Sequence, residues 1–198
     1  MACLLAVLLL PRVARAQSPP AGGWFVQAGA IADVDHSFFR SVPGDPPEPP
    51  SARTQPGLRL AGGRWLSRRS TARIGVDVPR AQHWRDFLAR YTHRSSMMWG
   101  ELGFHPVFPR AARLGFLVGA GYSRGITVVR RDPTSRDPAP RPERRVDGRS
   151  MFMLGAESRW PVSARLDVVA DIRMHLLLGP GAPSHVIARP GVSGRWRF

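Results

Sequence analysis

The chain has 198 residues, a length typical of one domain, and its 20 glycines and 20 prolines argue against a helical bundle. The single cysteine, Cys3, excludes a disulfide framework and a multi-cysteine zinc site. All 29 basic residues are arginine, and the formal net charge of +15 would ordinarily suggest nucleic acid as the partner.

The first residues predict export. Residues 2–10 form a short apolar run, Pro11 would end a helix there, and Ala14 and Ala16 occupy the two small-residue positions of a cleavage site. We therefore expect a cleaved signal peptide at 1–16, a short linker at 17–22 and an exported domain at 23–198. Export argues against a nucleic-acid partner. The chain also lacks the run of about 18 apolar residues that a membrane-spanning helix requires.

The remaining chain alternates apolar and polar residues with a period of two, which predicts strands. In the segment 165–178 the even positions are apolar, whereas Asp167, Asp171 and Arg173 occupy odd positions. A helix would scatter these charges around its circumference. Eight segments show the pattern, in chain order 24–34, 58–66, 71–78, 95–105, 113–129, 150–160, 165–178 and 186–198.

The connections between these segments predict the architecture. Long connections at 35–56, 79–94 and 130–149 alternate with short ones at 67–70, 106–112 and 161–164. Long loops at one end and tight turns at the other are typical of an up-and-down barrel in an outer membrane. Clusters of proline in the first and third long connections would end strand pairing there.

The composition of the polar faces indicates that they point into the barrel. A soluble barrel would instead turn its apolar faces inward. Eight strands enclose an interior that side chains fill, and the polar faces here carry glycine and charges of both signs. An apolar belt on the outside suits lipid rather than water. We therefore predict a lumen network of paired charges, made of Arg59, Arg73, Asp77, Glu101, Glu157, Asp167, Asp171, Arg173 and Arg189.

The last strand runs to a terminal phenylalanine, Phe198. Together with the signal peptide and the eight alternating segments, this strand resembles the small outer-membrane β-barrel proteins of the OmpA/OmpX type, over residues 23–198. The resemblance implies an all-β, eight-stranded antiparallel up-and-down transmembrane barrel in the outer membrane. It also implies that Val192, Trp196 and Phe198 form the signal that the barrel-assembly machinery reads. Pro190 departs from the pattern, because it removes a ladder donor and predicts a gap or bulge.

Aromatic residues gather where an interfacial girdle would lie. They fall at segment ends on the short-turn side, and they are Trp24, Trp160, Trp196 and Phe198.

The third long connection is rich in arginine. A guanidinium pairs bidentately with phosphate, and the nearest anions outside an outer membrane are the phosphates of lipopolysaccharide. A solvated loop without a specific ligand is the alternative. The candidate anion-contacting residues are Arg130, Arg131, Arg136, Arg141, Arg144 and Arg145.

A catalytic site is the weakest reading of the sequence. His93 and Ser95 share one face of a strand and faintly resemble the His–Ser pair of the lipid A deacylase barrel, but the spacing to Glu101 does not match. The histidines lack metal-ligand spacing. We therefore expect a non-enzymatic monomer without a cofactor, with a plugged lumen and a structural or surface-interaction role. The alternatives are a narrow channel or small-solute transporter and a lipid-modifying enzyme.

Overall fold

The computed structural model describes residues 22–36, 55–106, 114–133, 140–179 and 182–198. The predicted signal peptide and the linker up to residue 21 lie outside this part. The described residues form strands and contain no helix long and apolar enough to cross a membrane. The strands are β1 (Trp24–His36), β2 (Gln55–Trp65), β3 (Ser70–Pro79), β4 (Gln82–Arg85), β5 (Ala89–Phe104), β6 (Leu114–Arg131), β7 (Glu143–Pro161), β8 (Leu166–Gly179) and β9 (Ala182–Arg197).

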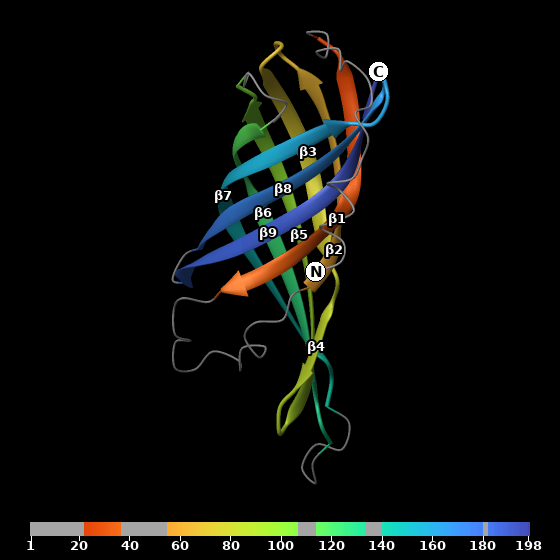
Figure 1. The fold of residues 1–198 in the computed structure, drawn as a ribbon. Helices are drawn as coiled ribbons and strands as arrows, with labels where there is room; N and C mark the ends of the chain where they lie inside the picture. The colour runs from red at the N-terminus through yellow and green to blue at the C-terminus, as the bar shows by residue number, and fades with distance from the viewer. Residues whose placement is uncertain (1–21, 37–54, 107–113, 134–139, 180–181) are drawn as a thin grey trace.

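Eight of the strands close into an antiparallel barrel (Figure 1). The order is β3-β2-β1-β9-β8-β7-β6-β5, and the pairing of β3 with β5 closes the ring. The eight wall strands correspond to the eight predicted segments. The predicted eight-stranded up-and-down barrel is therefore confirmed, and β4 is an additional strand that pairs with β5 on the same edge as β3, farther towards the long-loop end.

Side chains alternate between a buried interior and an exposed exterior. On β9, Arg189 and Arg195 are fully buried, whereas Val192 and Trp196 are 58% and 43% exposed. The same holds around the ring, so the apolar faces point outward, as predicted. Glycine allows the strands to fit around so narrow an interior: a Cβ atom on Gly119 would collide with the carbonyl of Gly100 and the side chain of Met153.

The exterior carries a belt of exposed apolar side chains, as expected for a surface that faces lipid. At the short-turn end of this belt, Trp24 and Phe198 are among its most exposed aromatic residues, and the Arg64 guanidinium lies 5.5 Å from the Trp24 ring centre. Further members around the ring are Leu60, Ile74, Met98, Leu102, Phe116, Leu154, Ile172 and Met174.

The wall is interrupted beside Pro190. On one side of this residue Ile31 pairs with Gly191, and on the other Val34 pairs with Ala188. The β1–β9 ladder therefore skips the positions around the proline, which cannot donate a hydrogen bond. On its other side, Pro190 lies opposite Ile172 of β8.

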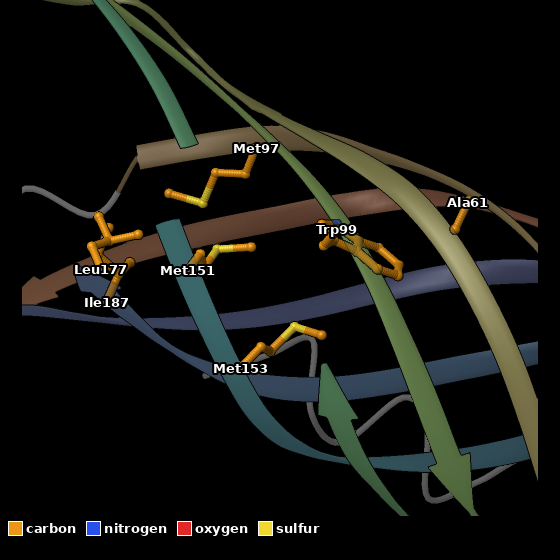
Figure 2. Packing of buried hydrophobic residues seen from close by; sticks show 7 residues of the cluster. All are labelled: Ala61, Met97, Trp99, Met151, Met153, Leu177 and Ile187. Atoms are coloured by element: carbon orange, nitrogen blue, oxygen red, sulfur yellow. The ribbon is translucent and has the colours of Figure 1, made fainter. Parts of the chain in front are cut away.

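A cluster of apolar side chains is also buried inside the barrel (Figure 2). Met97, Met151 and Leu177 each lie nearer to the long-loop end of their strand than the buried charges that follow the same inward face. On these strands the cluster lies on the long-loop side of the charges, whereas on β2 the buried Arg59 lies nearer to the long-loop end than Ala61. Its full membership is Ala61, Met97, Trp99, Met151, Met153, Leu177 and Ile187.

Three wall strands, β5, β6 and β7, continue beyond the barrel and are joined there by β4, which corrects two predicted loops. The segment 79–94 contains β4 and the first residues of β5, and the segment 130–149 contains the end of β6 and the start of β7. Figure 1 shows these strand ends projecting well past the ring. We call this region the projecting sheet, residues 82–96, 123–133 and 140–149. The parts of this sheet that were predicted as loops, residues 82–94, 130–133 and 140–149, lack the alternation that marks the wall.

Candidate functional site

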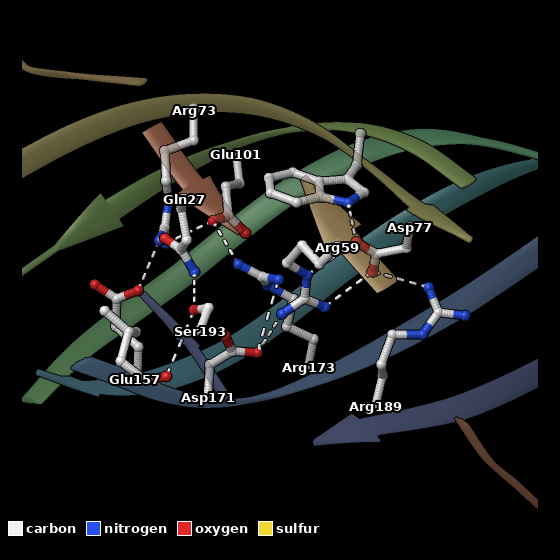
Figure 3. A network of polar contacts seen from close by, with 12 residues as sticks. Gln27, Arg59, Arg73, Asp77, Glu101, Glu157, Asp171, Arg173, Arg189 and Ser193 are labelled. Atoms are coloured by element: carbon white, nitrogen blue, oxygen red, sulfur yellow. Dashed lines mark hydrogen bonds and ion pairs between the residues drawn. The ribbon is translucent and has the colours of Figure 1, made fainter. Parts of the chain in front are cut away.

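The lumen holds a charge-balanced set of buried side chains (Figure 3). Among the described residues, six arginines and six carboxylates are buried, so the chain's positive excess lies elsewhere. The arginines are Arg59, Arg73, Arg159, Arg173, Arg189 and Arg195. The carboxylates are Asp33, Asp77, Glu101, Glu157, Asp167 and Asp171.

Asp77 is the centre of the outer half of this network. Its Oδ1 accepts hydrogen bonds from Arg59 Nε at 2.9 Å and from Trp99 Nε1 at 3.0 Å. Its Oδ2 accepts from Arg189 Nη1 at 2.9 Å, and Arg59 also reaches Asp171 at 2.7 Å. These contacts join five strands across the lumen, β2, β3, β5, β8 and β9.

Glu157 is the centre of the inner half. Its Oε2 accepts from Arg73 Nη1 at 2.7 Å and from Arg195 Nη2 at 2.8 Å. Glu101 accepts from Arg173 Nη2 at 2.9 Å and also pairs with Arg73. Figure 3 shows these groups spanning the interior between facing strands. Buried ions of opposite charge that share hydrogen bonds avoid the large cost of an isolated buried charge.

Aromatic rings that the sequence analysis did not place in the lumen cover the guanidinium groups. Arg173 lies 4.6 Å from the Trp99 ring centre, and Arg159 lies 4.7 Å from that of Trp65. Arg195, which lies over Phe25 at 4.8 Å, was likewise missing from the predicted network. The period-two pattern could have predicted these positions, because each of these residues is an even number of positions from an inward-facing charged residue on its own strand.

The remaining predicted lumen residue, Asp167, lies at the short-turn end of the network. It is 3.2 Å from Arg197 Nη2 and 3.9 Å from Arg159 Nη1. All nine predicted residues are therefore buried inside the ring and take part in ion pairs.

Of the candidate catalytic residues, His93 and Ser95 lie two positions apart on β5, but Glu101 is not brought to them. His93 lies in the projecting sheet, where its Nδ1 is 2.9 Å from Thr127 Oγ1, and burial lowers its pKa. Glu101 lies in the lumen and is bound by Arg73 and Arg173. Within the described segments, no group of three or more histidine, cysteine or acidic side chains is arranged to hold a metal ion.

The projecting sheet has the opposite electrostatic character. Its described residues include ten arginines but only four carboxylates, Asp86, Asp132, Glu143 and Asp147. The arginines are Arg85, Arg90, Arg94, Arg124, Arg130, Arg131, Arg141, Arg144, Arg145 and Arg149.

One face of this sheet is packed and partly neutralised. Trp84 stacks on Tyr91 with ring centres 5.2 Å apart and a 5° interplanar angle, beside buried Val129. Further along, Glu143 pairs with Arg145 at 2.6 Å and with Arg131 at 3.5 Å. The hydrogen bond from Arg145 lowers the pKa of Glu143.

The other face carries most of the excess charge. Arg85 lies directly opposite Arg90, which lies directly opposite Arg130, so the three share one face. Asp132 is the one carboxylate with a described ion pair to this row, at 2.6 Å from Arg85 and 3.9 Å from Arg90. Opposed like charges repel, which makes the row suited to an anionic ligand. By strand parity the face comprises Arg85, Arg90, Arg94, Arg124, Arg130 and Arg144, and we call it the arginine face.

Four of the six predicted anion-contacting residues thus lie in strands rather than in a loop. Arg130 and Arg131 belong to β6, and Arg144 and Arg145 belong to β7. Arg141 lies in the connection between these strands, and Arg136 lies outside the described residues. Arg85, Arg90, Arg94 and Arg124 were missing from the prediction, because only the strand register brings them to the same face.

The residues of the expected assembly signal lie on the outer surface of the closing strand. Val192 and Trp196 belong to β9 and Phe198 follows it, with its backbone amide donating to the Trp24 carbonyl at 3.0 Å. Phe198 is 73% exposed. The three side chains therefore lie on one accessible face, where another protein could contact them.

Comparison with known proteins finds relatives at the level of structure. No family model and no curated protein sequence matches the chain. Among solved structures, the attachment invasion locus protein Ail of Yersinia pestis matches with a TM-score of 0.59 and 8% identity, over 90% of this chain and 100% of Ail. Neisserial surface protein A matches with a TM-score of 0.61 and 11% identity, over 91% and 100%.

A third match is a major outer membrane protein of Thermus thermophilus, with a TM-score of 0.57 and 10% identity, over 88% of this chain and 99% of that one. The three structures share the closed barrel rather than residues at any site. This chain therefore has the fold of the small eight-stranded outer-membrane β-barrel proteins.

Proposed function

We propose that this chain is an integral outer-membrane protein that binds polyanions at the cell surface through its arginine face. The observation that carries the proposal is the row of Arg85, Arg90 and Arg130, which shares the single carboxylate of Asp132 among the described residues. Guanidinium groups bind phosphate and sulfate oxygens with charge-assisted, bidentate hydrogen bonds.

The position of the face favours the phosphates of lipopolysaccharide as the ligand. On β5 and β6 the exposed belt ends at Met98 and Tyr122, and Arg94 and Arg124 follow on the same outward side. Arginines at this height would meet the phosphates of the surrounding outer leaflet. A sulfated polysaccharide offers similar chemistry, and one Ail structure is of its complex with the heparin analogue sucrose octasulfate (TM-score 0.58, 9% identity, 90% of this chain and 100% of that chain covered).

The test is a binding measurement with the full-length protein in lipid nanodiscs. Replacing Arg94, Arg124 and Arg144, the members of the arginine face nearest to the belt, together with glutamine should weaken lipopolysaccharide binding roughly a hundredfold at low salt, since each cation beside an anionic surface contributes about 1 kcal/mol. Added salt should weaken the wild-type interaction. The matched control replaces three exposed arginines at the short-turn end, Arg68, Arg69 and Arg165. Equal binding by both triple variants would contradict the proposal, and heparin in a parallel arm distinguishes the two polyanions.

The lumen supports a closed barrel rather than a channel. Its buried charges are paired, and buried apolar side chains pack beside them inside the ring. We therefore expect planar-bilayer recordings of the purified monomer to show no steady conductance. Stable open-channel currents would favour the transporter alternative instead.

A further inference from the structure

The hairpin of β4 and β5 ends in two apolar side chains that nothing covers. Phe87 is 94% exposed and Leu88 is 65% exposed, and they occupy the turn between the two strands. Figure 1 shows this turn among the parts of the molecule farthest from the ring. A fully solvated phenylalanine beside a solvated leucine loses the favourable free energy of burial, so the pair is suited to contact with another apolar phase.

The turn itself is firmly built. Asp86 Oδ1 accepts hydrogen bonds from the backbone amides of Leu88 at 2.8 Å and Ala89 at 2.7 Å. Its Oδ2 accepts from the Tyr91 hydroxyl at 2.6 Å, and the Asp86 amide donates to the Ala89 carbonyl at 3.0 Å. Phe87 and Leu88 are thus held outward by a network that fixes the backbone on both sides.

Neighbouring apolar residues of the same hairpin are packed. Trp84 stacks on Tyr91, and Ala89 and Val129 are buried against them. The hairpin therefore separates its apolar residues into a small core and an exposed tip. An apolar tip on a packed, preorganised stem loses little entropy when it enters another phase.

Charge around the tip identifies the kind of surface it fits. Arg85 directly precedes the turn and Arg90 follows it, and their side chains are 58% and 66% exposed. A convex apolar tip flanked by cations is complementary to an anionic bilayer, where apolar side chains enter the interface and arginines contact the headgroups.

The tip lies too far from the barrel's own lipid belt to use that membrane. The exposed belt begins on β5 at Met98, which follows Met97. Leu88 lies nine residues before Met97. This separation corresponds to about 30 Å of extended strand. A second bilayer facing the cell surface is the anionic lipid phase that the tip can reach.

We propose that the β4–β5 hairpin docks on an apposed anionic phospholipid bilayer by inserting Phe87 and Leu88 into its interface. This goes beyond polyanion binding by the arginine face, because the apolar tip is the part that enters the lipid. The arginines beside the turn supply attraction to the headgroups, and Asp86 and Tyr91 hold the tip in the inserting geometry.

Flotation with vesicles tests the proposal, using the full chain in nanodiscs and vesicles of phosphatidylcholine with or without phosphatidylserine. The wild type should float with the phosphatidylserine vesicles. The double variant Phe87→Ser, Leu88→Ser should bind them at least roughly tenfold more weakly while retaining lipopolysaccharide binding. The matched control, Leu66→Ser with Val162→Ser, changes two exposed apolar residues at the opposite end and should bind like the wild type.

A fluorescent label distinguishes insertion from surface attraction. The chain's single cysteine, Cys3, is replaced by serine, and an environment-sensitive dye is attached through Phe87→Cys. Vesicle binding should shift the dye emission to the blue. Absence of wild-type flotation, equal flotation by the tip variant, or bound vesicles without a spectral shift would each overturn the proposal. If the wild type floated with the vesicles but did not bind lipopolysaccharide or heparin, the proposed polyanion binding by the arginine face would be wrong and the membrane-docking proposal would stand.

Discussion

The lumen and the projecting sheet use the same residue types in opposite ways. In the lumen, six arginines and six carboxylates are buried together, and Glu157 accepts hydrogen bonds from both Arg73 and Arg195. In the projecting sheet, arginines outnumber carboxylates and are mostly exposed. Burial requires each charge to have a partner, whereas water tolerates an excess. We infer that the lumen arginines stabilise the barrel and that the exposed ones are available to ligands.

The largest difference between the two regions is expected when one carboxylate is removed from each. Replacing Glu157 with glutamine should lower the free energy of unfolding by about 3–5 kcal/mol, because it leaves Arg73 and Arg195 without their shared counter-ion. Urea unfolding in detergent micelles, followed by tryptophan fluorescence, measures this change. Replacing the exposed Glu143 with glutamine is the matched control and should leave the unfolding midpoint unchanged. Equal midpoints for the two variants would show that the lumen network contributes nothing to stability.

A second test moves from the lumen to the outer surface of the same strands. Ile172 lies on the outward side of β8 near the middle of the strand and is 50% exposed, so an arginine there should cost about 2–4 kcal/mol in the bilayer. Val146 also points outward, but it lies in the projecting sheet and is 54% exposed. Val146→Arg should therefore fold into lipid vesicles as efficiently as the wild type. If both variants refolded equally well, the position of the lipid belt would be wrong.

The wall of the barrel was predictable because lipid lies on one side of it and a polar lumen on the other. In the segment 165–178, side chains that face lipid are therefore apolar and side chains that face the lumen are mostly polar, which produces the alternation in the sequence. The projecting sheet has water beyond both faces. Arg130 and Arg131 lie consecutively in β6, a pattern that reads as a loop although the backbone is paired.

The candidate site was predictable only in part for the same reason. The charged residues of the lumen followed from strand parity, but the rings over them, such as Trp99 above Arg173, required knowledge of packing across the barrel. The arginine face depends on register: Arg85 and Arg130 are 45 positions apart in the sequence and join one row through Arg90. The outer turn at Phe87 and Leu88 shows no alternation of apolar and polar residues that could predict it. Its geometry follows from the hydrogen bonds that Asp86 accepts.

The smallest expected effect is a change in the pKa of Asp86 in the hairpin turn, which should leave the stability of the barrel unchanged. The hydrogen bond from Tyr91 is the main cause of a lowered pKa of Asp86, and the same bond raises the pKa of Tyr91. The ionised Asp86 thus stabilises the turn above the ordinary carboxyl range, and this contribution is lost as the pH falls through the lowered pKa. The Tyr91 contribution is present below the ordinary phenol pKa of about 10 and is lost as the pH rises through the raised value.

Replacing Tyr91 with phenylalanine should therefore raise the pKa of Asp86 towards its ordinary value, as measured by the carboxyl carbon chemical shift during an NMR titration. The amide shifts of Leu88 and Ala89, which both donate to Asp86, should follow the same titration. Tyr122→Phe is the matched control, since the chain's only other tyrosine lies on the outward belt away from the turn. An unchanged Asp86 titration in Tyr91→Phe would show that the backbone amides alone hold the carboxylate. Because the turn lies beyond the last pairing of β3 with β5, the unfolding midpoint of the barrel should be the same in both variants.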